Sequence, residues 1–123
     1  MSGESKILII DDDPDALETM SAILETRDYQ VFTALSGSEG IDKAVKEKPD
    51  LIIMDVMMPG LDGFATCKMI KENEETKDIP VILITGKELV HDMEKVRAAG
   101  AKEFMIKPID WDKLFLKIKN LIP

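Results

Sequence analysis

The chain has a single cysteine, Cys67, and a single histidine, His91, among its 123 residues. One cysteine excludes an intrachain disulfide and any metal site built from several cysteines. One histidine argues against a histidine-based metal site and against a Ser-His-Asp triad. We expect His91 to be an exposed helical residue. Cys67 falls on the apolar face of a predicted helix, so we expect it to be buried as a packing residue.

Long apolar runs and known phosphate-binding motifs are also missing. No run approaches the roughly 20 apolar residues that a membrane helix needs, and residues 1–6 contain no signal-peptide core. We therefore expect a cytoplasmic protein that does not associate with membranes. Neither G-x-x-x-x-G-K-[ST] nor G-x-G-x-x-G occurs, so nucleotide binding has no motif behind it.

Positive charge is scarce, since 16 Lys and Arg face 24 Asp and Glu, for a net charge of −8. A phosphate backbone attracts a basic surface, so we expect no direct binding of nucleic acid by this chain. The acidic balance favours cations, or protein partners with a basic surface.

What the chain does contain is a set of short apolar runs that each end at a polar residue. The runs cover residues 7–10, 51–54, 81–84 and 104–106. The polar residues that follow them are Asp11, Asp12, Asp55, Thr85 and Lys107. Short runs rich in β-branched residues are typical of buried parallel strands. Ligands bind at the carboxyl ends of such strands, so the pattern predicts that these side chains share one sheet edge.

Amphipathic segments alternate with the runs, which predicts a single α/β domain over residues 1–123 with five βα units. We expect a second, shorter strand at 29–33, a loop at 71–78 and a helix over about 88–99, closed by Gly100. Asp13 is expected to cap the first helix, with Pro14 in its first turn. Strand order 2-1-3-4-5 does not follow from periodicity alone. It is the common solution for a doubly wound sheet, and it would place strands one and three side by side.

Three carboxylates would then converge, because Asp11 and Asp12 follow strand one and Asp55 ends strand three. Clustered carboxylates repel, and protonation or a bound cation relieves them. Magnesium, a hard cation that prefers oxygen ligands, is the natural fit. The alternative for Asp11 and Asp12 is a solvated loop with a helix cap, and the third carboxylate on another core strand weighs against it. For Asp13 we favour the cap.

A carboxylate beside a cation, with apolar residues around it, can attack a phosphoryl group and form an acyl phosphate. Asp55 is the candidate, and Lys107 and Thr85 would supply donors to the transferring oxygens. Taken alone, Lys107 is more consistent with a surface lysine and Thr85 with a hydroxyl bonded to nearby backbone. Their joint placement at strand ends favours the site.

At this point four segments resemble the receiver domain of two-component response regulators, the CheY-like superfamily. They are residues 10–14, 54–63, 84–86 and 104–109, which match its motifs in order and spacing. The resemblance covers essentially the whole chain. It implies a flavodoxin-like fold, in which a five-stranded parallel sheet of order 2-1-3-4-5 is doubly wound with five helices.

The resemblance also implies a division of roles. Asp55 would accept a phosphoryl group from a sensor histidine kinase or a phosphotransfer protein. Asp11 and Asp12, with Asp55 and the backbone carbonyl of Met57, would hold Mg²⁺, for which Mn²⁺ could substitute. Lys107 would contact the phosphoryl oxygens.

Activation would then pass from the site to a surface. Thr85 would move toward the phosphate, Phe104 would change rotamer, and the face of the fourth helix, fifth strand and fifth helix would bind a partner. That partner would be a downstream protein or a missing output domain, in direct signalling or a phosphorelay. Apart from catalysing its own phosphorylation and dephosphorylation, the protein would not be an enzyme. Bulky Met57 and long Lys87 would shield the acyl phosphate and lengthen its life.

Two other functions stay open at this stage. One is a magnesium-dependent phosphatase or phosphotransferase acting on small molecules. Haloacid-dehalogenase-type phosphatases have a second Asp two residues after the first. This chain has Met57 at that position, which counts against the alternative. The other is a pseudo-receiver that binds partners without phosphorylation. The sequence also leaves open whether the natural protein is a stand-alone receiver or part of a longer regulator.

Overall fold

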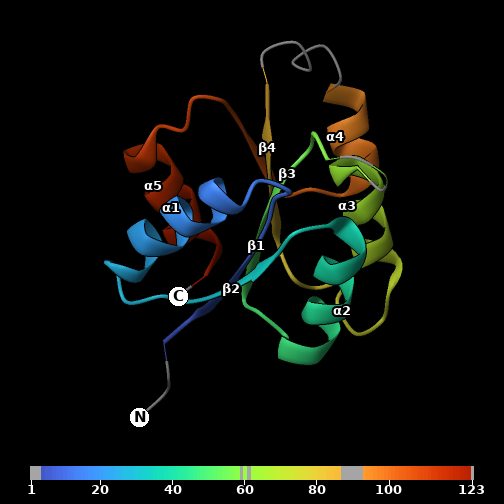
Figure 1. Ribbon diagram of the computed structural model, residues 1–123. Coiled ribbons are helices and arrows are strands. Elements are labelled where there is room, and N and C mark those ends of the chain that lie inside the picture. The colour runs from blue at the N-terminus through green and yellow to red at the C-terminus, as the bar shows by residue number, and fades with distance from the viewer. Residues whose placement is uncertain (1–3, 59, 61, 87–92, 123) are drawn as a thin grey trace.

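The computed structural model describes residues 4–58, 60, 62–86 and 93–122. Five parallel strands form one sheet in the order β2-β1-β3-β4-β5, which confirms the predicted order (Figure 1). The strands are β1 (Lys6–Ile10), β2 (Gln30–Ala34), β3 (Leu51–Asp55), β4 (Val81–Thr85) and β5 (Glu103–Ile106). All residues of β3 and β4 are buried, as expected for central strands covered on both faces.

Helices cover both faces of the sheet, which makes the fold doubly wound. The helices are α1 (Pro14–Glu25), α2 (Gly37–Glu47), α3 (Gly63–Glu72), α4 (Met93–Ala99) and α5 (Trp111–Leu121). Helices α1 and α5 lie on one face, and α2, α3 and α4 lie on the other (Figure 1). An apolar core lies between the sheet and each group of helices. Three helices therefore cover one face and two cover the other.

The strand register places the predicted site residues at the same edge of the sheet. Ile10 pairs with Met54 across β1 and β3, so Asp11 and Asp55 each stand one residue beyond a paired position. Thr85 pairs with Ile106, so Lys107 stands one residue beyond the last pair of β4 and β5. Because all five strands are parallel, the four side chains leave the sheet at its carboxyl edge.

Four helices begin at this same edge, each with a capping side chain. Asp13 accepts a hydrogen bond from the Asp15 amide with Pro14 in the first turn, as predicted. Helices α2, α3 and α5 begin the same way, capped by Ser36, Asp62 and Asp110. Each cap satisfies an amide that the helix itself leaves unpaired.

Some boundaries differ from the sequence prediction. Strand β2 lies one residue further along than residues 29–33, and α3 continues to Glu72, into the expected loop over 71–78. Although its residues are mostly polar, part of this segment packs into the protein. Thr76 is fully buried and donates to the Ile70 carbonyl, while the Lys71 ammonium donates to the carbonyls of Lys77 and Ile79.

The helix expected over residues 88–99 is described only from Met93, so the expectations for Lys87 and His91 lie outside the described residues. Gly100 follows it with φ of +83°, which confirms the left-handed position that closes the helix. Among the described residues, no helix has the length and apolar character needed to cross a membrane.

Candidate functional site

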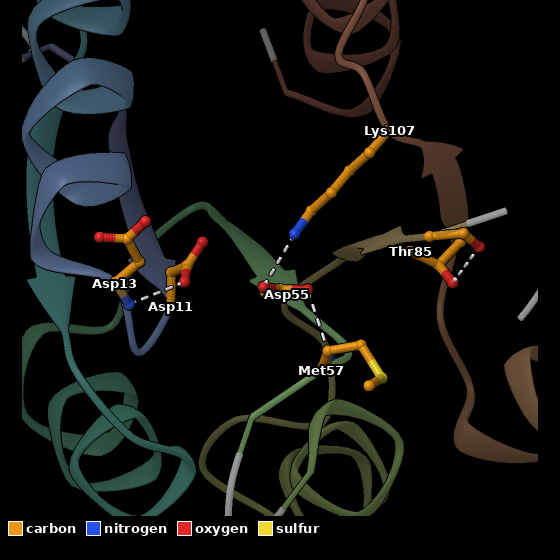
Figure 2. Close-up of polar contacts among 7 residues, drawn as sticks. Asp11, Asp13, Asp55, Met57, Thr85 and Lys107 are labelled. Atoms are coloured by element: carbon orange, nitrogen blue, oxygen red, sulfur yellow. Dashed lines mark hydrogen bonds and ion pairs between the residues drawn. The ribbon is translucent and has the colours of Figure 1, made fainter. Parts of the chain in front are cut away.

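Three carboxylates meet at the carboxyl edge of β1 and β3. Asp11, Asp12 and Asp55 each offer an oxygen, and these three oxygens lie within 4.8 Å of one another. Asp11 and Asp55 are 7% and 6% exposed, whereas Asp12 is exposed to solvent. Figure 2 shows Asp11 and Asp55 on neighbouring strand ends. The predicted convergence is therefore present, and it places two nearly buried carboxylates close together.

Asp55 is held from two sides. Its Oδ2 accepts a hydrogen bond from the Lys107 ammonium at 3.1 Å, and its Oδ1 accepts one from the Met57 amide at 3.1 Å (Figure 2). Lys107 is thus more than an ordinary surface lysine, although its side chain is 47% exposed. It follows β5, and its peptide bond to Pro108 is cis. The contacts fix the orientation of the Asp55 carboxylate.

Asp11 is the electrostatically disfavoured member of the acidic group. Burial raises its pKa above the ordinary value of 3.8, the Asp13 amide opposes this by donating to Oδ1 at 3.0 Å, and the charge of Asp55 raises it again. Lys107 lowers the pKa of Asp11, and Asp12 raises it. Burial and the neighbouring negative charges both disfavour the ionised form of Asp11. A bound cation would offset both effects.

Thr85 is buried at the end of β4, and its hydroxyl donates to the Gly86 carbonyl at 3.2 Å (Figure 2). The hydroxyl therefore makes the local backbone contact that the sequence also allowed. Phe104 lies on β5 opposite Leu83 and is half-buried against the core under α2, α3 and α4. The roles of Thr85 and Phe104 in a switch stay predictions.

The backbone at the start of α3 lies in close contact with the backbone that follows Asp55. A Cβ atom at Gly63 would lie 2.6 Å from the Asp55 carbonyl oxygen and 2.6 Å from the Val56 Cα. The Gly63 amide donates to the Val56 carbonyl at 3.0 Å, so the start of α3 presses on the chain that leaves β3. In the sequence, Gly63 stands out only as the last residue of segment 54–63, which resembles the receiver family. The signal that sequence reasoning missed is glycine directly after the capping Asp62.

The three methionines near the site differ in exposure. Met54 and Met58 are buried, but Met57 is 54% exposed. The Met57 amide donates to Asp55, so the residue lies beside the acidic group. Its side chain is exposed to solvent. The role of the Met57 carbonyl as a metal ligand stays a prediction.

The fold and this acidic edge define a doubly wound α/β domain with a cation-binding type of site at its sheet switch point. A family model described as the response regulator receiver domain matches residues 7–119. The chain therefore belongs to the response regulator receiver domain family.

Individual relatives agree with this assignment. Protein PilH of Pseudomonas aeruginosa is 36% identical over 118 residues, covering 96% of this chain and 98% of PilH. Response regulator PleD of Caulobacter vibrioides is 38% identical over 117 residues, which cover 95% of this chain and 26% of PleD. The chain thus spans nearly all of one relative and about a quarter of the other.

Solved structures show the same fold. The chemotaxis protein CheY4 of Vibrio cholerae has a TM-score of 0.90 at 28% identity, covering 98% of this chain and 100% of CheY4. TrrA of Thermotoga maritima, a response regulator solved in complex with Mg²⁺-BeF, has a TM-score of 0.85 at 31% identity. The match covers 96% of this chain and 99% of the TrrA chain.

Proposed function

We propose that this chain is a phosphorylation-activated signalling receiver in which Asp55 accepts the phosphoryl group. The observation that carries the proposal is the setting of Asp55, a nearly buried carboxylate bound by the Lys107 ammonium at 3.1 Å and grouped with two other carboxylates. The donor would be a sensor histidine kinase or a phosphotransfer protein, as the family assignment supports.

Mg²⁺ is the proposed cofactor, with Mn²⁺ as a substitute. The residues fit such an ion, because three carboxylate oxygens gather within 4.8 Å and burial with neighbouring charge raises the pKa of Asp11. Asp11, Asp12, Asp55 and the Met57 carbonyl would hold it. When bound, the cation would neutralise charge on the phosphoryl oxygens during transfer. The likeness to TrrA, solved with Mg²⁺-BeF, supports this choice.

In the proposed transfer, an Asp55 oxygen attacks phosphorus, and the bond between phosphorus and the donor atom breaks with its electron pair leaving on the donor. Lys107 now donates to Asp55 and would shift its hydrogen bond to a phosphoryl oxygen. Lys107 thus holds the carboxylate before transfer and stabilises negative charge after it.

The change would then travel through Thr85 and Phe104. The Thr85 hydroxyl would exchange its bond to the Gly86 carbonyl for one to the phosphoryl group. Half-buried Phe104, on the neighbouring strand, would repack in the space behind it. The face of α4, β5 and α5 would change shape and bind a downstream protein or an output domain.

The same proposal covers the wider biology of the chain. It would act in the cytoplasm and would catalyse only its own phosphorylation and dephosphorylation. Its net charge of −8 supports protein partners over direct contact with nucleic acid.

Labelling by acetyl phosphate tests the proposal. Wild-type protein should gain one phosphoryl group in the presence of Mg²⁺, detected by intact-mass spectrometry, and lose the reaction in EDTA. Asp55→Asn should abolish labelling. Asp13→Asn is the matched control, because Asp13 caps α1 and asparagine is an equally good cap. Labelling that persists in Asp55→Asn would show that another residue is the acceptor.

A further inference from the structure

A cleft of about 900 Å³ opens beside Asp55 and extends toward α1 and α5. Asp11, Asp55 and Lys107 line it at one end. Ala16, Met20, Ile109 and Trp111 are among the residues that line the rest. The lining contains neither Met57 nor Thr85, nor any described residue of α2, α3 or α4. The cleft is therefore a one-sided extension of the acidic site.

The architecture explains why this side is open. Two helices cover this face of five strands, whereas three cover the other. The lining includes Ile53 of β3 and Ile84 of β4, two buried residues of the central strands. Trp111 and Ile109, on the α5 side, are only partly buried and leave apolar surface at the wall. The volume and the apolar wall with polar groups at one end are typical of a small-molecule site.

We propose that this cleft binds the apolar leaving group of a small-molecule acyl phosphate, so that it sets which phosphodonors can load Asp55. The proposal rests on the proposed function of Asp55 as acceptor. An Asp55 oxygen would attack phosphorus, and the bond from phosphorus to the acyl oxygen would break. The electron pair would leave on that oxygen as a free carboxylate, and no proton or further reactant is needed.

The position of the cleft fits that reaction. In phosphoryl transfer the leaving group lies on the side of phosphorus opposite the attacking oxygen. A phosphoryl group within reach of Asp55 and Lys107 would lie in the end of the cleft that these two residues line. An aromatic or branched acyl group would then contact Ala16 and Trp111 and bury apolar surface. An acetyl group is too small to reach this wall, so it gains little from the cleft.

A pair of donors tests the idea. Benzoyl phosphate and acetyl phosphate release carboxylic acids of similar strength, so their intrinsic reactivities are close. With wild-type protein and Mg²⁺, we expect benzoyl phosphate to label Asp55 with an efficiency about tenfold higher, measured as the initial rate per donor concentration. Benzoate should also inhibit labelling by acetyl phosphate at concentrations where acetate does not.

Two substitutions on one helix locate the effect. Ala16→Met places a longer side chain in the cleft and should reduce the ratio of benzoyl to acetyl efficiency toward one. Ala22→Met is the matched control, because Ala22 is exposed on α1 and lies outside the cleft lining, and it should leave the ratio at the wild-type value. Trp111→Ala removes the aromatic wall and should also lower the ratio.

The outcomes separate the two proposals. Equal efficiency of the two donors in wild-type protein would overturn the cleft assignment while leaving Asp55 as the acceptor. A ratio unchanged by Ala16→Met and Trp111→Ala would overturn it too, since the preference would then arise elsewhere. No labelling of Asp55 by either donor would instead overturn the proposed function on which the inference rests.

Discussion

Lys107 and Asp55 are 52 residues apart in the chain, yet the lysine ammonium lies 3.1 Å from the Asp55 carboxylate. The ammonium comes from the residue after β5, and β4 lies between β5 and the strand that carries Asp55. Without a metal, Lys107 is the only cation among the described residues that has an ion pair with the acidic group. Lys107 therefore occupies the electrostatic role that a bound cation would take over.

Neutralising Lys107 should consequently strengthen cation binding while it weakens phosphoryl transfer. For Lys107→Met we expect Mg²⁺ to bind about three- to tenfold more tightly, since a nearby positive charge is removed from a partly exposed site. Isothermal titration calorimetry measures the affinity, and Lys113→Met on α5 is the exposed control. Weaker Mg²⁺ binding in Lys107→Met would mean that the lysine organises the carboxylates rather than competing with the cation.

Asp11 predicts how the metal-free protein responds to pH. Burial raises the pKa of Asp11 above 3.8, so the native state holds this proton more tightly than the unfolded chain does. The contribution of Asp11 to stability is therefore largest below pH 3.8 and is lost as pH rises through the raised pKa. In EDTA at about pH 7, Asp11→Asn should unfold at a higher urea concentration than wild type.

The same substitution should reduce the stability that the protein gains from Mg²⁺. The asparagine side chain in Asp11→Asn keeps an oxygen for the Asp13 amide but removes one charge from the acidic group, so the stabilisation of the protein by Mg²⁺ should shrink. Asp13→Asn should change neither measurement. If Asp11→Asn were less stable than wild type in EDTA, repulsion within the acidic group would not limit stability.

Gly63 and Gly40 should respond differently to an added methyl group. At Gly63 a Cβ meets backbone atoms of Asp55 and Val56 at 2.6 Å, which cannot move without shifting the end of β3. At Gly40 it meets the Ile10 side chain, which can change rotamer. We expect Gly63→Ala to lower the free energy of unfolding by about 2–3 kcal/mol and Gly40→Ala to lower it by less.

Urea unfolding compares the two alanine variants, and Ile10→Val added to Gly40→Ala should recover part of the smaller loss. The rate of phosphorylation and the affinity for Mg²⁺ should also fall more in Gly63→Ala, since the contact involves the backbone of Asp55 itself. Similar losses in both variants would show that the chain after β3 yields as readily as a side chain.

Cys67 should be unreactive in the folded protein. It is fully buried, its thiol donates to the Ala99 carbonyl at 3.3 Å, and burial raises its pKa from 9.0 to about 11, against a smaller lowering by Lys71. Because the thiolate is the reactive form, iodoacetamide at about pH 8 should label unfolded protein and leave native protein unmodified.

The raised pKa of Cys67 also fixes a pH window. Its contribution to stability is complete below pH 9 and falls as pH rises toward 11, since the unfolded thiol ionises first. Urea unfolding of wild type and Cys67→Ala at about pH 8 and about pH 10.5 measures this, and the wild type should lose more stability than the variant. Equal losses would assign the alkaline instability to other groups.

Met57 should control how long the phosphoryl group survives. Its amide binds Asp55 while its long side chain is 54% exposed, so the side chain would stand at the edge of an acyl phosphate formed on Asp55. We expect Met57→Asn to shorten the lifetime of phosphorylated Asp55 several-fold by admitting water. Decay followed by mass spectrometry after donor removal tests this, with exposed Met69→Asn on α3 as the control.

Sequence reasoning reached the fold because the buried strands are short, separate and rich in β-branched residues. Asp11 and Asp55 could be placed on one edge without coordinates, since every strand end of a parallel sheet faces the same way. Strand order was less accessible. Periodicity says which residues are buried but not which strands pair, so the order came from the common topology and the family resemblance.

Side-chain detail was beyond the sequence for a different reason. The Thr85 hydroxyl can reach either local backbone or a ligand, and only coordinates show its bond to Gly86. The exposure of Met57 beside buried Met54 and Met58 depends on the turn after β3, which hydrophobicity does not encode. The cleft beside Asp55 arises from the spacing of α1 and α5, a property of helix packing that no single segment carries.

The helix caps at the carboxyl edge add one more consequence. Asp13, Asp62 and Asp110 cap helices at the edge where Asp11, Asp12 and Asp55 gather, so carboxylates concentrate on one end of the molecule. Negative side-chain charge is thus concentrated at this end, and we expect it to attract cations and basic partners to this end before any contact forms. Such attraction extends only about 8–10 Å at physiological ionic strength, so added salt slows encounter more than it loosens the complex.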